Sequence, residues 1–155
     1  MSHLNEMKTS MTDKEMLIRG LMRHMHLQRQ DIEVHDRAQR INGYHPEDTF
    51  VGNVIVRRGK TGIPSDIGWE FKNKTFVGHV DSYDYTSWVG TPGCKGIQLD
   101  DNWNQGLQQS YNQEVIKQGL TDKGYTIRES VSKDGYPVFS YFHTEAQQQQ
   151  GGIIL

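Results

Sequence analysis

Residues 66–81 constrain the fold most, because apolar and polar side chains alternate on both sides of a short turn. Asn73 and Lys74 form that turn. The alternation has the period of a β-strand, so one face of the predicted hairpin is apolar and the other is polar. The turn sets these residues opposite one another: Phe71 and Phe76, Trp69 and Gly78, Ile67 and Val80. A slip of one residue would expose the aromatic side chains, so we expect this register and a buried aromatic face.

A second hairpin is predicted near the C-terminus. Residues 125–131 and 136–142 flank a turn that contains Asp134 and Gly135. The Asp-Gly pair is favoured in tight hairpin turns because glycine adopts a positive φ at no steric cost.

Two helices are predicted. Thr12 and Glu15 have the spacing of a capping box, with Thr12 as the cap, and apolar residues then recur at helical spacing over residues 13–26. Asp101 or Asn102 can cap the second helix. Its apolar residues step by four along one face: Trp103, Leu107, Tyr111 and Val115. Gly124 is a suitable stop for it.

Strands over residues 3–9, 32–41 and 53–58 complete the predicted order, which is strand, helix, four strands, helix, two strands. Hairpin-linked strands with two helices indicate an α+β fold, in which both helices pack on one face of a mostly antiparallel sheet. We expect a single domain over residues 1–143. Residues 144–155 form a tail rich in Gln and Gly with an apolar end. Such a tail is normally disordered by itself, and we expect that a partner surface or a second copy of the chain holds it.

The composition excludes several classes of protein. Lys and Arg total 17 against 19 Asp and Glu, a net charge of -2, which argues against nucleic-acid binding driven by charge. Neither a membrane-spanning apolar run nor a signal peptide is predicted. Cys94 is the only cysteine, so the chain can form no intramolecular disulfide. We expect a cytoplasmic protein.

The polar face of the first hairpin is the strongest chemical candidate. It carries Asp66, Glu70, Lys72, His79 and Asp81, and the register predicts that Asp66 lies opposite Asp81 and His79 lies near Gly68. Two carboxylates and an imidazole can bind a divalent cation, so Asp66, His79 and Asp81 are candidate metal ligands. A solvated sheet face with cross-strand charge pairs, each worth about 0.2–1 kcal/mol, is the interpretation we favour. No cofactor is then required.

Residues 82–101 form a long connection with three aromatic residues close together, and long loops are often functional. A glycine-rich segment follows them. The candidate residues for binding a partner protein are Tyr83, Tyr85, Trp88, Cys94 and Lys95. A loop folded back over the sheet is the alternative.

Several short segments occur in an order and at spacings that resemble one known family. They are Met1-Ser2-His3 with Lys8-Thr9, Asn42-Gly43-Tyr44, Val54-Ile55-Val56-Arg57, Asp66-Ile67-Gly68-Trp69, Tyr111, Gly124-Tyr125-Thr126-Ile127 and Asp134-Gly135. Over residues 1–142 the chain resembles the hypothetical chloroplast reading frame thirty-five family, a domain-of-unknown-function family of cyanobacteria, red-algal plastids and other bacteria. It departs from the family pattern at residues 84–98 and at its C-terminus, as a divergent member of plastid or phage origin would.

The resemblance implies a small soluble domain in the cytoplasm, the plastid stroma or the cytoplasm of a phage host, and it carries over no catalytic residue. The sequence thus predicts a non-enzymatic accessory protein that binds an unidentified protein partner. The alternative is a metal-dependent hydrolase or nuclease that uses Asp66, Glu70, His79 and Asp81.

Overall fold

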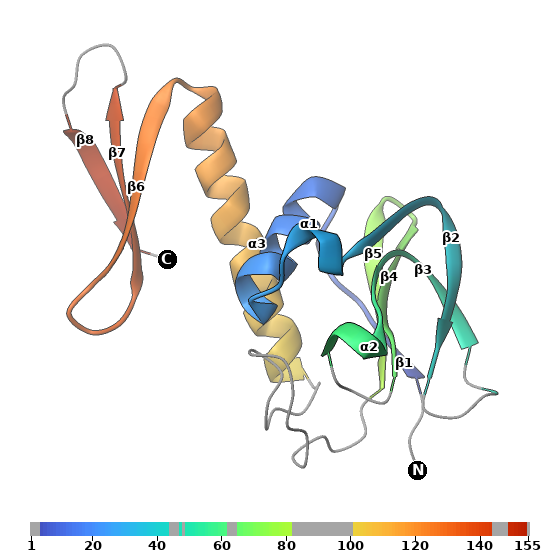
Figure 1. Ribbon diagram of the computed structural model, residues 1–155. Coiled ribbons are helices and arrows are strands. Elements are labelled where there is room, and N and C mark those ends of the chain that lie inside the picture. The colour runs from blue at the N-terminus through green and yellow to red at the C-terminus, as the bar shows by residue number, and fades with distance from the viewer. Residues whose placement is uncertain are drawn as a thin grey trace. The chain divides into compact units, whose positions relative to one another are not determined.

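The computed structural model describes residues 4–43, 47, 49–61, 65–81, 101–143 and 149–154. Its elements in chain order are β1 (Leu4–Met7), α1 (Lys14–Met25), the 3-10 turn η1 (Arg29–Asp31), β2 (Glu33–Asn42), β3 (Thr49–Val56), α2 (Arg58–Thr61), β4 (Ile67–Lys72), β5 (Thr75–Asp81), α3 (Asp101–Asp122), β6 (Tyr125–Val131), β7 (Pro137–His143) and β8 (Gln149–Ile154). The fold is α+β, as the sequence predicts (Figure 1). The chain divides into two compact units, Met1–Tyr111 and Asn112–Leu155, and the boundary falls within α3.

The first unit is built on a five-stranded sheet in the order β1-β5-β4-β3-β2, and every neighbouring pair is antiparallel. The predicted hairpin lies at its centre, with Phe71 opposite Phe76 and Trp69 opposite Gly78. Asn73 and Lys74 have φ values of 50° and 69°. Two successive positive φ values give a tight turn the twist that the flanking strands require. The observed pairing of β4 with β5 confirms the predicted register.

Both α1 and the first part of α3 cover one face of this sheet (Figure 1). Apolar side chains from the two helices and from the sheet form one buried cluster, which includes Leu17, Leu21, Trp69, Trp103 and Leu107. The step of four along α3 buries Trp103, Leu107 and Tyr111 as predicted. Val115 lies beyond the unit boundary and is 42% exposed.

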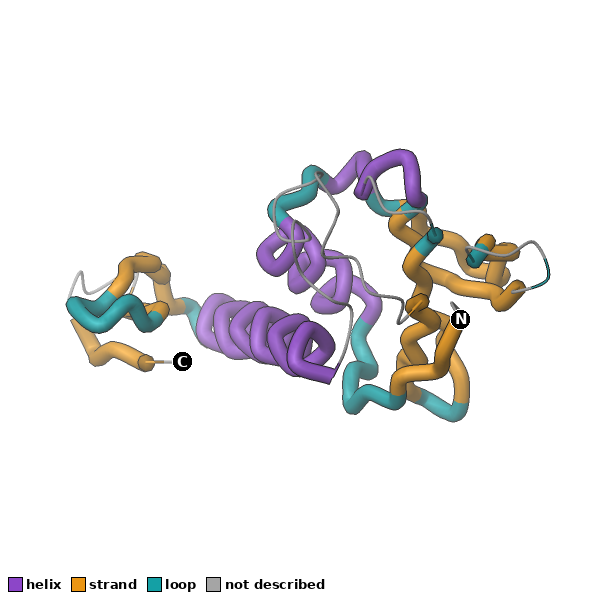
Figure 2. The backbone as a smooth tube through the Cα atoms, turned by 90° about the horizontal axis from the view of Figure 1, so that it is seen from below, coloured by secondary structure: helices purple, strands orange, loops and turns teal. Residues whose placement is uncertain are grey.

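Helices α1 and α3 lie side by side (Figures 1 and 2), and a glycine at the contact lets their backbones come close. A Cβ added at Gly20 would stand 3.1 Å from the backbone N and Cα of Tyr111. The Tyr111 hydroxyl also accepts hydrogen bonds from the backbone N–H groups of Thr12 and Asp13. The segment that enters α1 is therefore tied to α3.

The predicted cap of the first helix is wrong by one residue. The cap is Asp13, whose carboxylate accepts from the backbone N–H of Met16 at 3.0 Å. The Thr12 N–H instead donates to Tyr111. Because Tyr111 holds both Thr12 and Asp13, the helix begins at Lys14, and Asp13 is the residue in the extended conformation that a cap adopts.

The second unit contains a three-stranded antiparallel sheet in the order β6-β7-β8. The predicted hairpin of β6 and β7 is present, with Tyr125 opposite His143 and Val131 opposite Pro137, and its second strand begins and ends one residue later than predicted. Gly124 and Gly135 have φ values of 88° and 87°. The structure adds β8 to the predicted order, because residues 149–154 of the tail pair with β7. The strands also divide between two sheets, where the sequence predicted one.

No helix within the described ranges is long and apolar enough to cross a membrane.

Candidate functional site

The polar face of the central hairpin carries the predicted metal ligands, and the register places them only in part as predicted. Gly68 lies opposite His79, as expected. Asp66 precedes β4, and its N–H donates to the backbone oxygen of Asn42 at the end of β2. Asp81 is the last residue of β5, and its side chain lies outside the described part of the structure.

The Asp66 side chain is only 2% exposed, and both of its oxygens accept hydrogen bonds. One oxygen accepts from the backbone N–H of Asn42 at 2.9 Å and from the Arg57 guanidinium at 3.0 Å. The other accepts from the backbone N–H of Arg58 at 3.0 Å. Three donors, one of them the cationic Arg57, satisfy this buried carboxylate. Asp66 therefore joins the end of β2, the end of β3 and the start of β4.

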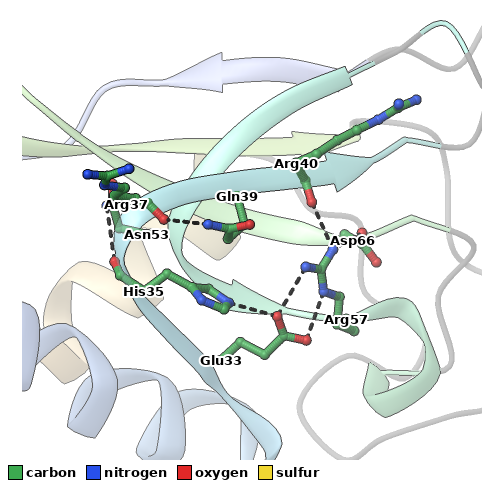
Figure 3. Close-up of polar contacts among 8 residues, drawn as sticks. All are labelled: Glu33, His35, Arg37, Gln39, Arg40, Asn53, Arg57 and Asp66. Carbon is green, nitrogen blue, oxygen red and sulfur yellow. Dashed lines mark hydrogen bonds and ion pairs between the residues drawn. The ribbon is translucent and has the colours of Figure 1, made fainter.

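Arg57 lies between two carboxylates, as Figure 3 shows. Its guanidinium donates two hydrogen bonds to Glu33, at 2.9 and 3.0 Å, and one to the backbone oxygen of Arg40 at 3.0 Å. Hydrogen bonds from Arg57 lower the pKa of Glu33, and Glu33 in turn raises the pKa of Arg57. This two-pronged contact holds the arginine by geometry as well as charge. Arg57 also links Arg40, near the end of β2, to Asp66, just before β4.

His79 is fully buried on the same face of the sheet. Its Nε2 lies 3.2 Å from a carboxylate oxygen of Glu70, and its ring stacks on Phe50 with centroids 4.4 Å apart and planes 8° apart. Lys72 lies 3.7 Å from Glu70 and 3.4 Å from Glu6. Among described atoms, His79 Nδ1 has no hydrogen-bond partner.

The expectation of a solvated polar face holds for Lys72, which is exposed and pairs with Glu6 and Glu70. It fails for His79, because the end of the β2–β3 hairpin lies over that residue. Ile41 and Phe50 from that end pack against Ile55, on the side of the sheet that carries His79. Gly68 makes room for this approach, since a Cβ there would lie 3.1 Å from two side-chain atoms of Ile41. A small second core, formed by Ile41, Ile55 and Phe50, thus lies on this face, and its Phe50 ring covers His79.

Within residues whose side chains are described, no three His, Cys, Asp or Glu side chains are grouped so that they could hold a metal ion. Arg57 engages Asp66, and Phe50 and Glu70 engage His79. The described side chains of this face pair buried charged and polar groups with one another. The predicted partner-binding residues Tyr83, Tyr85, Trp88, Cys94 and Lys95 all lie outside the described residues.

A pocket of about 230 Å³ opens beside a bulge in β2, and no pattern in the sequence predicts it. The pairing of β2 with β3 shifts between Val34 and Gln39. The Asn53 amide holds the bulge by donating to the backbone oxygens of His35 and Asp36, both at 3.1 Å, and its oxygen accepts from the N–H of Phe71 at 2.9 Å. Regular alternation along residues 32–41 predicted an unbroken strand. A long-range side-chain contact that leaves no local pattern produces the bulge.

No protein-family model, curated protein or solved structure matches the chain. The resemblance to the chloroplast reading frame family therefore stays a prediction from the sequence.

Proposed function

We propose that the chain is a non-enzymatic accessory protein that acts by binding another protein. The observation that carries this proposal is the tip of the β6–β7 hairpin, where two large apolar side chains stand in solvent. Val131 is 71% exposed and Tyr136 is 57% exposed. Tyrosine is among the residues that most often supply binding energy at protein interfaces.

Three hydrogen bonds close the turn at the tip, which suits a binding anchor. The backbone N–H of Ser132 donates to the oxygen of Tyr136 at 2.8 Å, and the N–H of Tyr136 donates to the Ser132 hydroxyl at 3.0 Å. The N–H of Gly135 also donates to the Ser132 oxygen at 3.0 Å. An aromatic side chain on a fixed turn loses little further entropy when a partner covers it.

The partner in this proposal is either another protein or a second copy of the chain. β8 stands at the edge of its sheet, and an edge strand is where another chain can add a strand. Self-association through residues 144–155, and contacts from Tyr83, Tyr85 and Trp88, belong to the same proposal.

The test is affinity purification of the tagged chain from its native host, followed by quantitative mass spectrometry. A partner is expected with the native chain and lost with the double variant Val131→Ser, Tyr136→Ser. The matched control is Val115→Ser, which removes a 42% exposed apolar side chain from α3 in the same unit and should retain the partner. Equal recovery by the double variant and the native chain would contradict the proposal.

The second candidate is a metal-dependent hydrolase or nuclease built on Asp66, Glu70, His79 and Asp81. It is favoured by the 3.2 Å contact between the buried His79 and Glu70. A divalent cation that binds the folded chain raises its melting temperature. This candidate predicts such a rise with Mg²⁺, Mn²⁺ or Zn²⁺ that His79→Gln abolishes; an unchanged melting temperature with all three ions counts against it.

A further inference from the structure

We propose that the pocket beside the β2 bulge binds a free α-amino acid with an aromatic side chain. This inference is independent of the protein-binding proposal, which rests on the β6–β7 hairpin tip in the other unit. The pocket has a volume of about 230 Å³. Phe71 and Phe76 form its apolar part, and its polar lining comes from Thr12, Lys14, His35, Asp36 and Asn53.

The two phenylalanines offer a surface on which an aromatic ring can pack. Their ring centroids are 5.0 Å apart, with an angle of 52° between the planes. Phe76 is buried, whereas Phe71 is 49% exposed. Aromatic rings favour tilted or offset contacts at such distances, so a third ring can extend the pair and cover the exposed part of Phe71.

The polar lining presents one positive and one negative charge. Lys14 Nζ lies 3.8 Å from an Asp36 carboxylate oxygen, which is beyond hydrogen-bond distance. The Lys14 side chain is 46% exposed and that of Asp36 is 100% exposed. An exposed ion pair of this kind contributes little to stability. Lys14 and Asp36 can therefore separate and each pair with a ligand group instead, at a small cost in free energy.

A zwitterionic α-amino acid carries the complementary charges. Its carboxylate matches Lys14, which is also the first residue of α1, where the helix dipole favours negative charge. Its ammonium group matches Asp36. An aromatic molecule with only a negative charge would offer no cation to pair with Asp36, and one with only a positive charge would offer no anion to pair with Lys14.

The backbone at Asp36 is held in place before any ligand arrives. The Asn53 amide fixes the backbone oxygens of His35 and Asp36 on the bulge. His35 Nε2 lies 3.0 Å from Glu33, which Arg57 holds in turn. Figure 3 shows Asn53 and His35 of this network, which hold the bulge from which Asp36 projects, and a backbone that is already ordered spends less binding energy on ordering.

The test is a titration of the full chain with L-phenylalanine, followed by the backbone amide signals of Asp36, Asn53 and Phe71 in NMR spectra. Saturable shifts at all three are expected. Three probes each lack one feature: 3-phenylpropanoate lacks the ammonium, 2-phenylethylamine lacks the carboxylate and L-alanine lacks the ring. Each should bind roughly ten-fold more weakly or worse. An absence of saturable shifts up to about 10 mM L-phenylalanine, or equal affinity for any of these probes, would overturn the proposal.

Two variants assign the charges. Lys14→Gln should abolish the preference for L-phenylalanine over 2-phenylethylamine, and Asp36→Asn should abolish the preference over 3-phenylpropanoate. Lys74→Gln is the matched control, because Lys74 is an exposed residue that does not line the pocket, and it should leave all affinities unchanged. All three changes are on exposed side chains, and an unchanged melting temperature verifies that each variant is folded. Equal weakening by Lys14→Gln and Lys74→Gln would sink the assignment.

Discussion

At the scale of the residue, burial decides what the polar groups of this chain do. The sequence around them predicts that three charged residues lie on the surface: Glu33, Arg57 and Asp66. In the structure, Asp66 is buried and Arg57 bridges it to Glu33. Removing Arg57 would leave the buried Asp66 carboxylate without its cationic partner, a loss that typically costs about 3–5 kcal/mol. These charges stabilise the contact between the end of β2 and the residues just before β4.

Burial also sets the titration of His24, which leads to a prediction about pH. The ring packs against Trp103, with centroids 5.0 Å apart, and burial lowers the pKa of His24 below its ordinary value of 6.5. The unfolded chain takes up a proton near that ordinary value, whereas the folded chain resists it. The free energy of unfolding should therefore fall as the pH is lowered through 6.5 towards the folded-state pKa.

Denaturant titrations between about pH 8 and pH 5.5 measure this dependence. His24→Gln should flatten the profile in this range, whatever it does to overall stability. His26→Asn is the matched control: it removes a neighbouring histidine at the helix end, where φ is 54° and asparagine is tolerated. It should keep most of the slope, because burial is the largest cause of the lowered pKa of His24 and the charge of His26 is a smaller one. A slope that survives in His24→Gln and disappears in His26→Asn would show that another group is responsible.

At the scale of the element, the contact between α1 and α3 depends on glycines that lie where the helices meet. Gly20 faces the backbone of Tyr111, and Gly106 faces the ring of His24. A glycine inside a helix is unfavourable by itself, so its presence here reflects the space that the partner helix needs. Helical periodicity predicted both helices, but it carries no information about which residue faces the other helix.

Two identical substitutions on α3 should have opposite effects. Gly119→Ala gains helix propensity, and nothing described lies within 4 Å of the new Cβ, so stability should rise by about 1 kcal/mol. Gly106→Ala gains the same propensity, but its Cβ would lie 2.7 Å from His24 Cε1. Displacing that packed ring should give a net loss of about 1–3 kcal/mol. Chemical denaturation measures both, and equal stabilisation by the two variants would contradict the close contact.

At the scale of the whole molecule, apolar burial is concentrated in the first unit. The large buried cluster draws on α1, the five-stranded sheet and the first part of α3. Among described side chains after Tyr111, Phe139 is the one hydrophobic residue in the buried class. A three-stranded sheet that buries so little apolar surface gains little hydrophobic stabilisation, so its strands should open at a lower cost in free energy.

This asymmetry predicts different rates of amide hydrogen exchange in the two units. Hydrogen-bonded amides of β3 and β4 should exchange at least about ten-fold more slowly than those of β6 and β7, after correction for intrinsic rates. The comparison uses antiparallel ladders in both units, so the type of hydrogen bond is matched. Equal protection of the two sheets would mean that the second unit is stabilised by more than its described core.

The sequence by itself determined the elements that local rules control. The Asn73-Lys74 turn and the alternation around it set the register of β4 and β5, and Gly135 allowed the second hairpin, because a turn and its flanking strands lie within a few residues of each other. Only the tertiary structure decided which polar groups are buried. Asp66 meets Asn42, and Asn53 meets both His35 and Phe71, across separations of about twenty residues that no periodicity encodes. The charges that line the pocket come together for the same reason: Lys14 and Asp36 meet only once α1 and the bulged β2 pack on the same sheet.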